Sequence, residues 1–315
     1  MRGKGGPAMS ISWGIHVGQQ NITMDELRRL WTYADISGFG WLSVWDHLYC
    51  ATNDADPHYE AVACLAALAA DTKNLRCGCM VFAVPYRNLG LLAKSFMTLN
   101  HLSNGRFEPG LGAGWHEPEF RAFNYPFPPI KERMDMLDEG MQVMRSFIDN
   151  EVTDHHGRFF DFTNASMNPR PVGKLPLWIG GRGEKRTARM AAKYADGWNI
   201  AYVSPEDLAH KIEVLHHWCA VEGRDPNQIA VATQLGFFMA ASNDPKVMET
   251  TEAEMRRKVP HQDPAGQLIG SPAQVVERLR AYEAMGVKEI NIAIRPPVDW
   301  AALETFVNEV MPQFS

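Results

Sequence analysis

Short apolar runs alternate along the chain with longer segments in which apolar residues recur every three or four positions. The first pattern is typical of buried β-strands and the second of amphipathic α-helices. Residues 11–17 form the first such run. The capping box Thr23-Met24-Asp25-Glu26 then predicts the start of a helix, which Gly38 ends.

The same alternation continues to the C-terminal end. The predicted strands are residues 11–17, 41–47, 75–84, 106–112, 177–179, 198–203, 229–240 and 289–295. The predicted helices begin at Thr23, Tyr59, Leu89, Ile130, Arg186, Ser204, Ser271 and Trp300. Eight such units predict an α/β fold, a (β/α)8 TIM barrel. A doubly wound sheet is the alternative, but the turn after its first strand usually carries GxGxxG, which is absent here.

Two stretches are longer than ordinary connections. Residues 116–174 follow the fourth strand, and their part 151–171 has the pattern of a small hairpin. Residues 242–270, polar and rich in charge, follow the seventh strand. We therefore expect insertions after strands 4 and 7, both as walls or lids of a pocket at the mouth of the barrel. Residues 1–10 are expected to be a flexible tail, and 11–315 a single barrel domain.

Composition excludes several classes of function. The net charge is -6 and the pI is near 6.0, which gives no electrostatic case for nucleic acid or an anionic membrane. No apolar run approaches the roughly 20 residues that span a bilayer. Five cysteines, an odd number, suggest free thiols and a cytoplasmic protein. Because Cys77-Gly78-Cys79 has no second ligand pair, we expect no metal site.

The segment 177–199 combines an apolar run, the turn Gly180-Gly181-Arg182-Gly183 and a helix. Glycines let the backbone approach a ligand closely, and the unpaired N–H groups at a helix start attract anions. Arg182, Lys185 and Arg186 add positive charge. The segment is thus a candidate phosphate site of a cofactor, or alternatively a plain strand-to-helix turn with solvated arginines.

The second strand ends in Val44-Trp45-Asp46-His47. In a barrel this position places His47 at the mouth, where a histidine can exchange a proton near neutral pH. A structural histidine that is hydrogen-bonded at the start of a loop is the alternative.

Small residues end the fourth strand at Gly112-Ala113-Gly114, and Trp115 follows them. They leave room for a flat ring, which Trp115 is placed to border. An aromatic lining for such a ring, or alternatively ordinary barrel core, is offered by Trp13, Trp45, Phe82, Trp115 and Trp198.

Several separated motifs keep one order along the chain. They are Leu92-Ala93-Lys94, Leu99-Asn100-His101-Leu102-Ser103-Asn104-Gly105-Arg106-Phe107, Gly110-Leu111-Gly112-Ala113-Gly114-Trp115, Pro176-Leu177-Trp178-Ile179-Gly180-Gly181 and Tyr194-Ala195-Asp196-Gly197-Trp198. Together they resemble the luciferase-like flavin and deazaflavin oxidoreductases, over about Trp13 to Arg295. The resemblance implies a (β/α)8 barrel that binds the deazaflavin coenzyme F420, or alternatively FMN, at its C-terminal mouth.

The motifs look most like the F420-dependent branch, in which the matching histidine lies by the reactive ring carbon. His47 is therefore the implied acid/base residue. The implied cofactor contacts are Asp46, a bulge with a cis peptide at Met80 and Val81, Gly112, Ala113 and Gly114, and a phosphate grip at Gly180, Gly181, Arg182, Gly183 and Arg186.

The expected activity is hydride transfer between coenzyme F420 and an organic substrate. An FMN-dependent monooxygenase that uses dioxygen is the alternative, and a non-catalytic flavin-binding barrel is a third hypothesis. Some relatives that act on sugar phosphates carry a glutamate where this chain has Trp115. The difference favours a more apolar or aromatic substrate, in a pocket that includes Trp13 and Trp115. The resemblance also implies a homodimer, and a reductase that supplies reduced cofactor is a possible partner.

Overall fold

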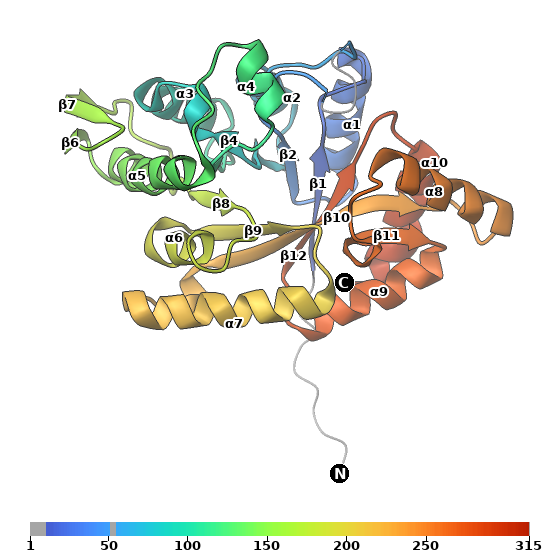
Figure 1. Cartoon of the computed structure of the whole chain (residues 1–315). Coiled ribbons are helices and arrows are strands. Elements are labelled where there is room, and N and C mark those ends of the chain that lie inside the picture. The colour runs from blue at the N-terminus through green and yellow to red at the C-terminus, as the bar shows by residue number, and fades with distance from the viewer. Residues whose placement is uncertain (1–10, 51–54, 315) are drawn as a thin grey trace.

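The computed structural model describes residues 11–50 and 55–314, and the predicted tail 1–10 lies outside the described residues. Its centre is a nearly closed parallel sheet with helices around it (Figure 1), the barrel that the sequence predicts. The strands of this sheet are β1 (Ser12–Val17), β2 (Trp41–Val44), β3 (Arg76–Cys79), β4 (Phe82–Ala83), β5 (Gly110–Gly112), β8 (Trp178–Gly180), β9 (Gly197–Ala201), β10 (Ala230–Met239), β11 (Gln267–Gly270) and β12 (Glu289–Ile294).

Helices follow most strands, as in any βα barrel. They are α1 (Met24–Ile36), α2 (Ala61–Asp71), α3 (Leu89–Leu102), α4 (Glu117–Ala122), α5 (Ile130–Asp149), α6 (Thr187–Tyr194), α7 (Pro205–Glu222), α8 (Pro245–Lys258), α9 (Pro272–Ala284) and α10 (Trp300–Thr305). The predicted cap of α1 is present, because the Thr23 side chain accepts a hydrogen bond from the Glu26 backbone N–H. In the described part of the chain, no helix is long and apolar enough to cross a bilayer.

The third strand of the barrel is interrupted. The predicted strand 75–84 is split into β3, which pairs with β2, and β4, which pairs with β5. Between them lie Met80 and Val81, joined by the cis peptide bond that the resemblance implies. Residue Cys77 also bridges to Phe107 in parallel, so the sheet is connected around the barrel at this point.

The interruption turns the Val81 side chain into the barrel. A Cβ atom on Gly112 would lie 2.4 Å from a Val81 methyl group, and one on Gly180 would lie 2.6 Å from the other. Gly110 is also crowded, since a Cβ atom there would lie 2.9 Å from a Val81 methyl group. Real Cβ atoms do not approach other heavy atoms this closely, so all three positions require glycine to leave room for the Val81 side chain.

Side chains alternate between the barrel interior and the helix layer along each strand. On β1, His16 faces the interior and bonds to Ser43 of β2, whereas Trp13 packs in the core between sheet and helices. The Trp13 ring lies 5.3 Å from the ring of Phe306 and 5.5 Å from that of Phe314. The prediction that Trp13 lines the substrate pocket is therefore wrong, because its position on β1 points it away from the interior.

Two partly buried ion pairs that share one arginine lie at the amino-terminal end of the barrel. Arg76, the first residue of β3, lies 2.6 Å from Glu289 at the start of β12 and 3.2 Å from Glu108. The indole Nε1 of Trp178 donates to the same Glu108 at 2.8 Å. This end is thus filled with paired charge and aromatic rings, and the opposite, carboxyl end is left for a ligand.

The insertion after the fourth barrel strand contains α4, α5 and the predicted hairpin, formed by β6 (Val152–His156) and β7 (Asp161–Ser166). The hairpin is held against α5 because the Glu139 carboxylate accepts from the backbone N–H groups of Phe159 and Phe160. In Figure 1 it lies at the outer edge, beside α3 and α5. The hairpin is thus bound to a helix, and α4 is the part of this insertion that reaches the mouth.

The insertion after the seventh barrel strand is more ordered than its polar sequence indicates. It contains α8 and also β11, which pairs in parallel with β10. Residues 242–270 therefore extend the sheet beyond the eight barrel strands, a feature that the sequence did not predict, because Gln267–Gly270 is short and follows prolines.

The Gly112→Ala variant should be destabilised by about 1–3 kcal/mol, the usual cost of forcing extra volume into a packed interior. Urea unfolding followed by circular dichroism measures this free energy. Because the added methyl collides with Val81, a Gly112→Ala/Val81→Ala double variant should lose less stability than the two single changes together. Additive losses would contradict this packing arrangement.

Candidate active site

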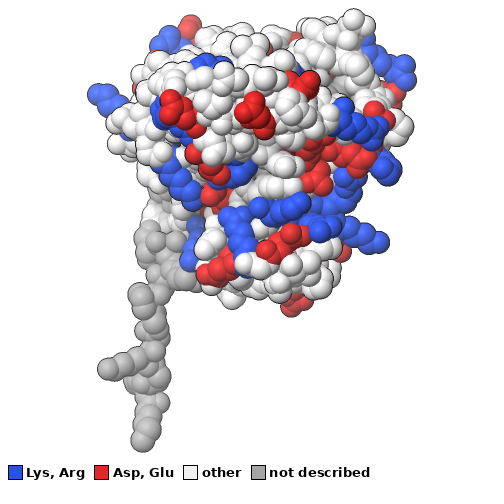
Figure 2. Space-filling model, turned by 90° about the vertical axis from the view of Figure 1, so that its left-hand side faces the viewer, with Lys and Arg blue, Asp and Glu red and all other residues white. Residues whose placement is uncertain are grey.

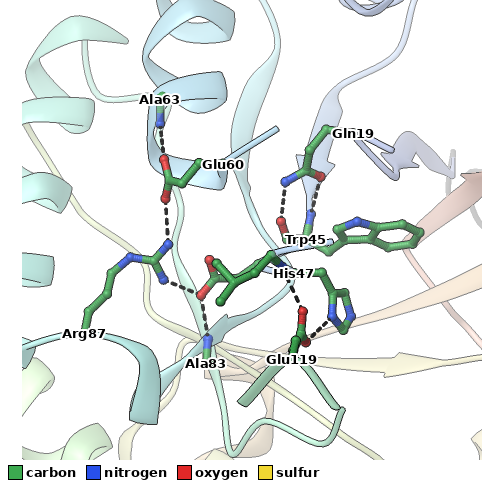
Figure 3. A network of polar contacts seen from close by, with 10 residues as sticks. Gln19, Trp45, His47, Glu60, Ala63, Ala83, Arg87 and Glu119 are labelled. Carbon is green, nitrogen blue, oxygen red and sulfur yellow. Dashed lines mark hydrogen bonds and ion pairs between the residues drawn. The ribbon is translucent and has the colours of Figure 1, made fainter. Parts of the chain in front are cut away.

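The loop after β2 carries His47 to the mouth of the barrel and is held there by the loop after β1. Gln19 makes two hydrogen bonds with the backbone of Trp45: its Nε2 donates to the carbonyl at 2.5 Å, and its Oε1 accepts from the N–H at 3.2 Å (Figure 3). The indole Nε1 of Trp45 donates to His58 at 3.1 Å. The Trp45 ring is thus fixed, and its centroid lies 5.8 Å from that of the His47 ring.

His47 is bound to a buried carboxylate. Its Nδ1 lies 2.6 Å from Oε1 of Glu119 on α4, while Oε2 of the same carboxylate accepts from the Leu48 backbone N–H at 2.8 Å (Figure 3). The Glu119 side chain is 1% exposed and that of His47 is 18% exposed. A carboxylate only accepts, so Nδ1 carries the hydrogen and Nε2 is left with its lone pair. Nε2 makes no hydrogen bond with another described residue.

The surroundings keep Glu119 ionised. Burial alone would raise the pKa of its carboxyl group, but hydrogen bonds from His47, Leu48 and Tyr86 lower the pKa below its ordinary value. Burial, together with the hydrogen bond to Glu119, raises the pKa of the Tyr86 hydroxyl group. The outcome is a fixed negative charge behind His47.

His16 is a second imidazole near this site, and it stays neutral. Its burial, and to a smaller extent the positive charge of Arg295, lowers its pKa to about 3. Its Nδ1 lies 2.8 Å from the Ser43 hydroxyl. A group with this pKa carries no proton to exchange near neutral pH, so His47 is better placed for that role.

Asp46 points to the other side of the same loop. Its Oδ2 accepts from the Ala83 backbone N–H at 3.0 Å and pairs with Arg87 at 2.5 Å. Arg87 in turn pairs with Glu60, the N-cap of α2, at 2.6 Å (Figure 3). Asp46 thus ties the loop to β4, next to the interruption of the third strand. Its Oδ1 is buried without a partner among the described residues, so its predicted cofactor contact stays a prediction.

The glycine-rich turn after β8 is exposed from Gly181 to Lys185. Gly181 has a φ of 132°, which side chains rarely allow. Arg182 makes no ion pair with another described residue, whereas Arg186 lies 2.7 Å from Asp135 of α5. On the face that carries α5, α6 and α7, acidic side chains lie among the basic ones (Figure 2). Arg182 therefore suits a phosphate better than Arg186, which already has a partner.

Unpaired polar atoms face the interior at the level of this turn. Asn199 pairs in register with Gly180, and its Nδ2 donates to Oε1 of Gln234 at 3.0 Å. Oδ1 of Asn199 and Nε2 of Gln234 are buried without partners among the described residues. Buried polar atoms are normally hydrogen-bonded. One acceptor and one donor side by side fit the polar edge of a flavin or deazaflavin ring, which alternates C=O and N–H groups.

The end of the fourth strand lies beside His47. The Trp115 side chain is 66% exposed, and its ring centroid lies 5.5 Å from that of His47. Gly114 has a φ of 72°, and a Cβ there would lie 2.6 Å from Phe120 of α4. The predicted Gly112 faces Val81, so its missing side chain serves packing beneath the mouth, and Ala113 is half-buried between these two glycines.

Several residues of the site were not identified from the sequence. Glu119 lies in a stretch that was expected to be a connection, and 72 positions separate it from its partner His47. Gln19 and Arg87 likewise act through partners distant in sequence. Within the described residues, no group of three His, Cys, Asp or Glu side chains is arranged to hold a metal ion.

Comparison with known proteins identifies relatives. Residues 8–265 match the model of a family described as luciferase-like monooxygenase. An uncharacterised protein of Mycobacterium bovis is 33% identical over 163 residues, a match that spans about half of either protein, 51% of this chain and 56% of the relative. An FMNH2-dependent dimethylsulfone monooxygenase of Pseudomonas fluorescens is 26% identical over 310 residues, covering 87% of this chain and 81% of that enzyme.

A similar fold is found in solved structures. An F420-dependent secondary alcohol dehydrogenase, in complex with an F420-acetone adduct, has a TM-score of 0.84 at 20% identity and covers 98% of this chain and 100% of that one. At this identity the likeness concerns the fold alone.

The Glu119→Gln variant should be less stable than the natural protein by about 1–3 kcal/mol at pH 7, because it loses a charge-assisted bond to His47. Folding lowers the pKa of Glu119, so this contribution is complete above the unfolded pKa of about 4.3 and is lost as the pH falls through the folded value. Urea unfolding at several pH values between 7 and 3 should show that the difference in unfolding free energy between the natural protein and the variant becomes smaller as the pH falls.

A suitable control is Glu117→Gln on the same helix, which removes an exposed pair with Arg121. This change should cost less than about 0.5 kcal/mol at any of these pH values. A stability gap for Glu119→Gln that does not depend on pH would show that the carboxylate is not held ionised by folding.

Proposed function

Because the chain belongs to the luciferase-like monooxygenase family, we propose that it is an oxidoreductase that transfers a hydride between coenzyme F420 and an organic substrate, with His47 as the residue that gives or takes the proton. The observation that carries this proposal is the His47–Glu119 pair at the mouth of the barrel, 2.6 Å between Nδ1 and Oε1. When bound, the deazaflavin supplies the hydride or accepts it.

The buried carboxylate prepares His47 for this task. It fixes the tautomer with hydrogen on Nδ1, so Nε2 faces reacting groups with its lone pair free. When Nε2 takes a proton, the negative charge of Glu119 stabilises the imidazolium, as a carboxylate does behind a catalytic histidine. Oxidation of an alcohol needs a base for the hydroxyl proton, and reduction of a carbonyl needs an acid for the oxygen. The same residue serves both directions.

The residues that would hold the cofactor lie around one mouth. Gly180 to Gly183 and Arg182 offer backbone N–H groups and a free guanidinium for its phosphate, and Asn199 and Gln234 offer unpaired atoms for the ring edge. Val81, which packs against Gly112 and Gly180, would contact the face of the cofactor ring that is turned to the barrel interior. Trp115 would border the substrate side, next to His47.

An FMN-dependent monooxygenase is the second candidate. It is favoured by the relative from Pseudomonas fluorescens, whose name states that it depends on FMNH2 and whose similarity covers 87% of this chain. The phosphate site and the ring platform suit either cofactor. In this case a partner reductase would have to supply reduced flavin.

A role in binding alone is less well supported. That hypothesis expects the insertion 242–270 to fill the space above the cofactor. Instead, α8 of this insertion lines an open cleft of about 330 Å³. Space for a substrate and a proton-exchanging histidine are both features of an enzyme.

A binding titration of the purified protein separates the two cofactors. We expect coenzyme F420 to bind and FMN to bind at least tenfold more weakly, and the Arg182→Gln variant to weaken whichever cofactor binds by about 10-fold, through loss of a phosphate contact. Tight binding of FMN with no binding of F420 would replace the proposal by the monooxygenase. Binding of neither would refute both.

The His47→Ala variant should lose about 10²–10⁴-fold in turnover, the usual contribution of a general acid or base, while its affinity for the cofactor changes less than threefold. His116→Ala is the matched control, since its ring also lies near Trp115 and its side chain makes no hydrogen bond with Glu119. Single-turnover absorbance of the deazaflavin measures both variants. Full activity of His47→Ala would exclude the assigned role.

A further inference from the structure

A cleft opens beside Trp45 at the carboxyl end of the barrel. Its volume is about 330 Å³, and it lies between the loops after β1 and β2, the last turn of α8 and the end of β12. Its walls are formed by Gln20, Asn21, Cys50, Asp56, Arg257, Lys258, Arg295, Pro296 and Pro297. The wall thus contains three cationic side chains and one carboxylate.

Arg295 is the least satisfied of these cations. Its guanidinium has no carboxylate within 4 Å among the described residues, and its Nε is buried without a hydrogen-bond partner. Its best polar contact is a long one, 3.5 Å from Nη2 to the Tyr202 hydroxyl. A partly buried cation without a counter-ion loses hydration and gains little in return. An anion that entered the cleft would supply the missing partner.

Two aromatic rings hold this guanidinium in place. Cζ of Arg295 lies 5.6 Å from the ring centroid of Trp45 and 5.8 Å from that of Tyr202. Such contacts orient the planar group and leave its edge available for a bidentate bond to an oxyanion. Neighbouring His16 has a lowered pKa, in part because of Arg295, so it adds no competing charge.

The other two cations have different roles. Lys258 pairs with Glu254 at 2.7 Å and donates to the Arg295 carbonyl at 3.0 Å, so it fixes the end of β12. Arg257, with a side chain that is 72% exposed, lies at the rim. Glu254 also lies 3.9 Å from Arg257, so two carboxylates, Glu254 and Asp56, face the three cations and the wall keeps a positive balance.

The cleft lies away from the expected phosphate of the cofactor. In the sheet, β9 and β10 separate β8, which ends at Gly180, from β12, after which Arg295 follows. The rings of Trp45 and His47 are in contact, and Arg295 lies over the same Trp45. The Arg295 end of the cleft therefore lies on the side of the mouth that carries His47, away from the glycine-rich turn.

We propose that the substrate of this enzyme is an organic oxyanion, such as a carboxylate, whose charged group is bound by Arg295 and whose apolar part lies against Pro296 and Pro297. This inference rests on the proposed function, because it assigns the substrate of the same site. It agrees with the apolar or aromatic substrate that Trp115 favours, and it adds a charge at the far end of that substrate. The volume of the cleft suits a small molecule.

The test compares an aromatic carboxylate with a neutral aromatic alcohol of similar size, and both with an inorganic oxyanion. Isothermal titration calorimetry is carried out with benzoate, benzyl alcohol and inorganic phosphate, on the protein with and without its cofactor. We expect benzoate to bind at least 10-fold more tightly than benzyl alcohol, with an affinity that falls as salt is raised. Phosphate that binds more tightly than benzoate would assign the oxyanion as a phosphate rather than a carboxylate.

The Arg295→Gln variant should lose about 10- to 100-fold in affinity for benzoate and none for benzyl alcohol, as expected for one charge-assisted contact. Arg295→Lys should retain part of the affinity. The matched control is Arg256→Gln, an exposed neighbour on α8 outside the cleft, paired with Glu252. It should bind benzoate as the natural protein does.

Equal affinities for benzoate and benzyl alcohol in the natural protein would overturn the proposal, and this comparison requires no variant to fold. An undiminished benzoate affinity in Arg295→Gln would also overturn it. The proposed function fails separately. Suppose that neither F420 nor FMN binds, while benzoate still binds more tightly than benzyl alcohol and this preference depends on Arg295. In that case the anion site stands and the oxidoreductase does not. If F420 binds and benzoate binds no more tightly than benzyl alcohol, the oxidoreductase stands and the anion site does not.

Discussion

The structure depends on how a closed parallel barrel fills its own interior. Few inward-facing side chains are available, and Val81 occupies the space that three glycines on β5 and β8 leave empty. The third strand is interrupted between β3 and β4, and Val81 at this interruption fills the barrel interior beneath the mouth. A flat ring can then lie on the Val81 side chain, which keeps it from entering deeper into the barrel.

The mouth above Val81 is assembled by long-range polar contacts. Gln19 holds the loop that carries Trp45, Arg87 joins Asp46 to the start of α2, and Glu119 binds His47 from an inserted helix. Each contact joins two segments that meet only in the folded chain. The geometry around His47 is therefore a property of the whole barrel rim and not of any one loop.

Much of the fold could be predicted from the sequence, because each strand and helix carries its own local signal. The periodicity of apolar residues identifies the eight barrel strands and the insertion hairpin, and a family resemblance places the cis peptide at Met80 and Val81. The prediction that failed concerns the direction in which a side chain points from its strand. The aromatic Trp13 suits a ring pocket by residue type, yet it lies at the amino end of β1 and its place in the alternation turns it toward Phe306. The partners of His47 and of Asp46 could not be found, since nothing in a single sequence marks pairs 72 and 41 positions apart.

The short helix α4 has a further consequence. It follows Trp115, the exposed ring next to His47, and it also carries Glu119, the carboxylate that fixes the His47 tautomer. These two residues are four positions apart on one short segment, so access to the site and the orientation of its histidine are not independent. A displacement of the segment that widens the entrance also withdraws the acceptor from Nδ1. The width of the entrance and the hydrogen bond that orients the His47 ring are thus set by one segment of the chain.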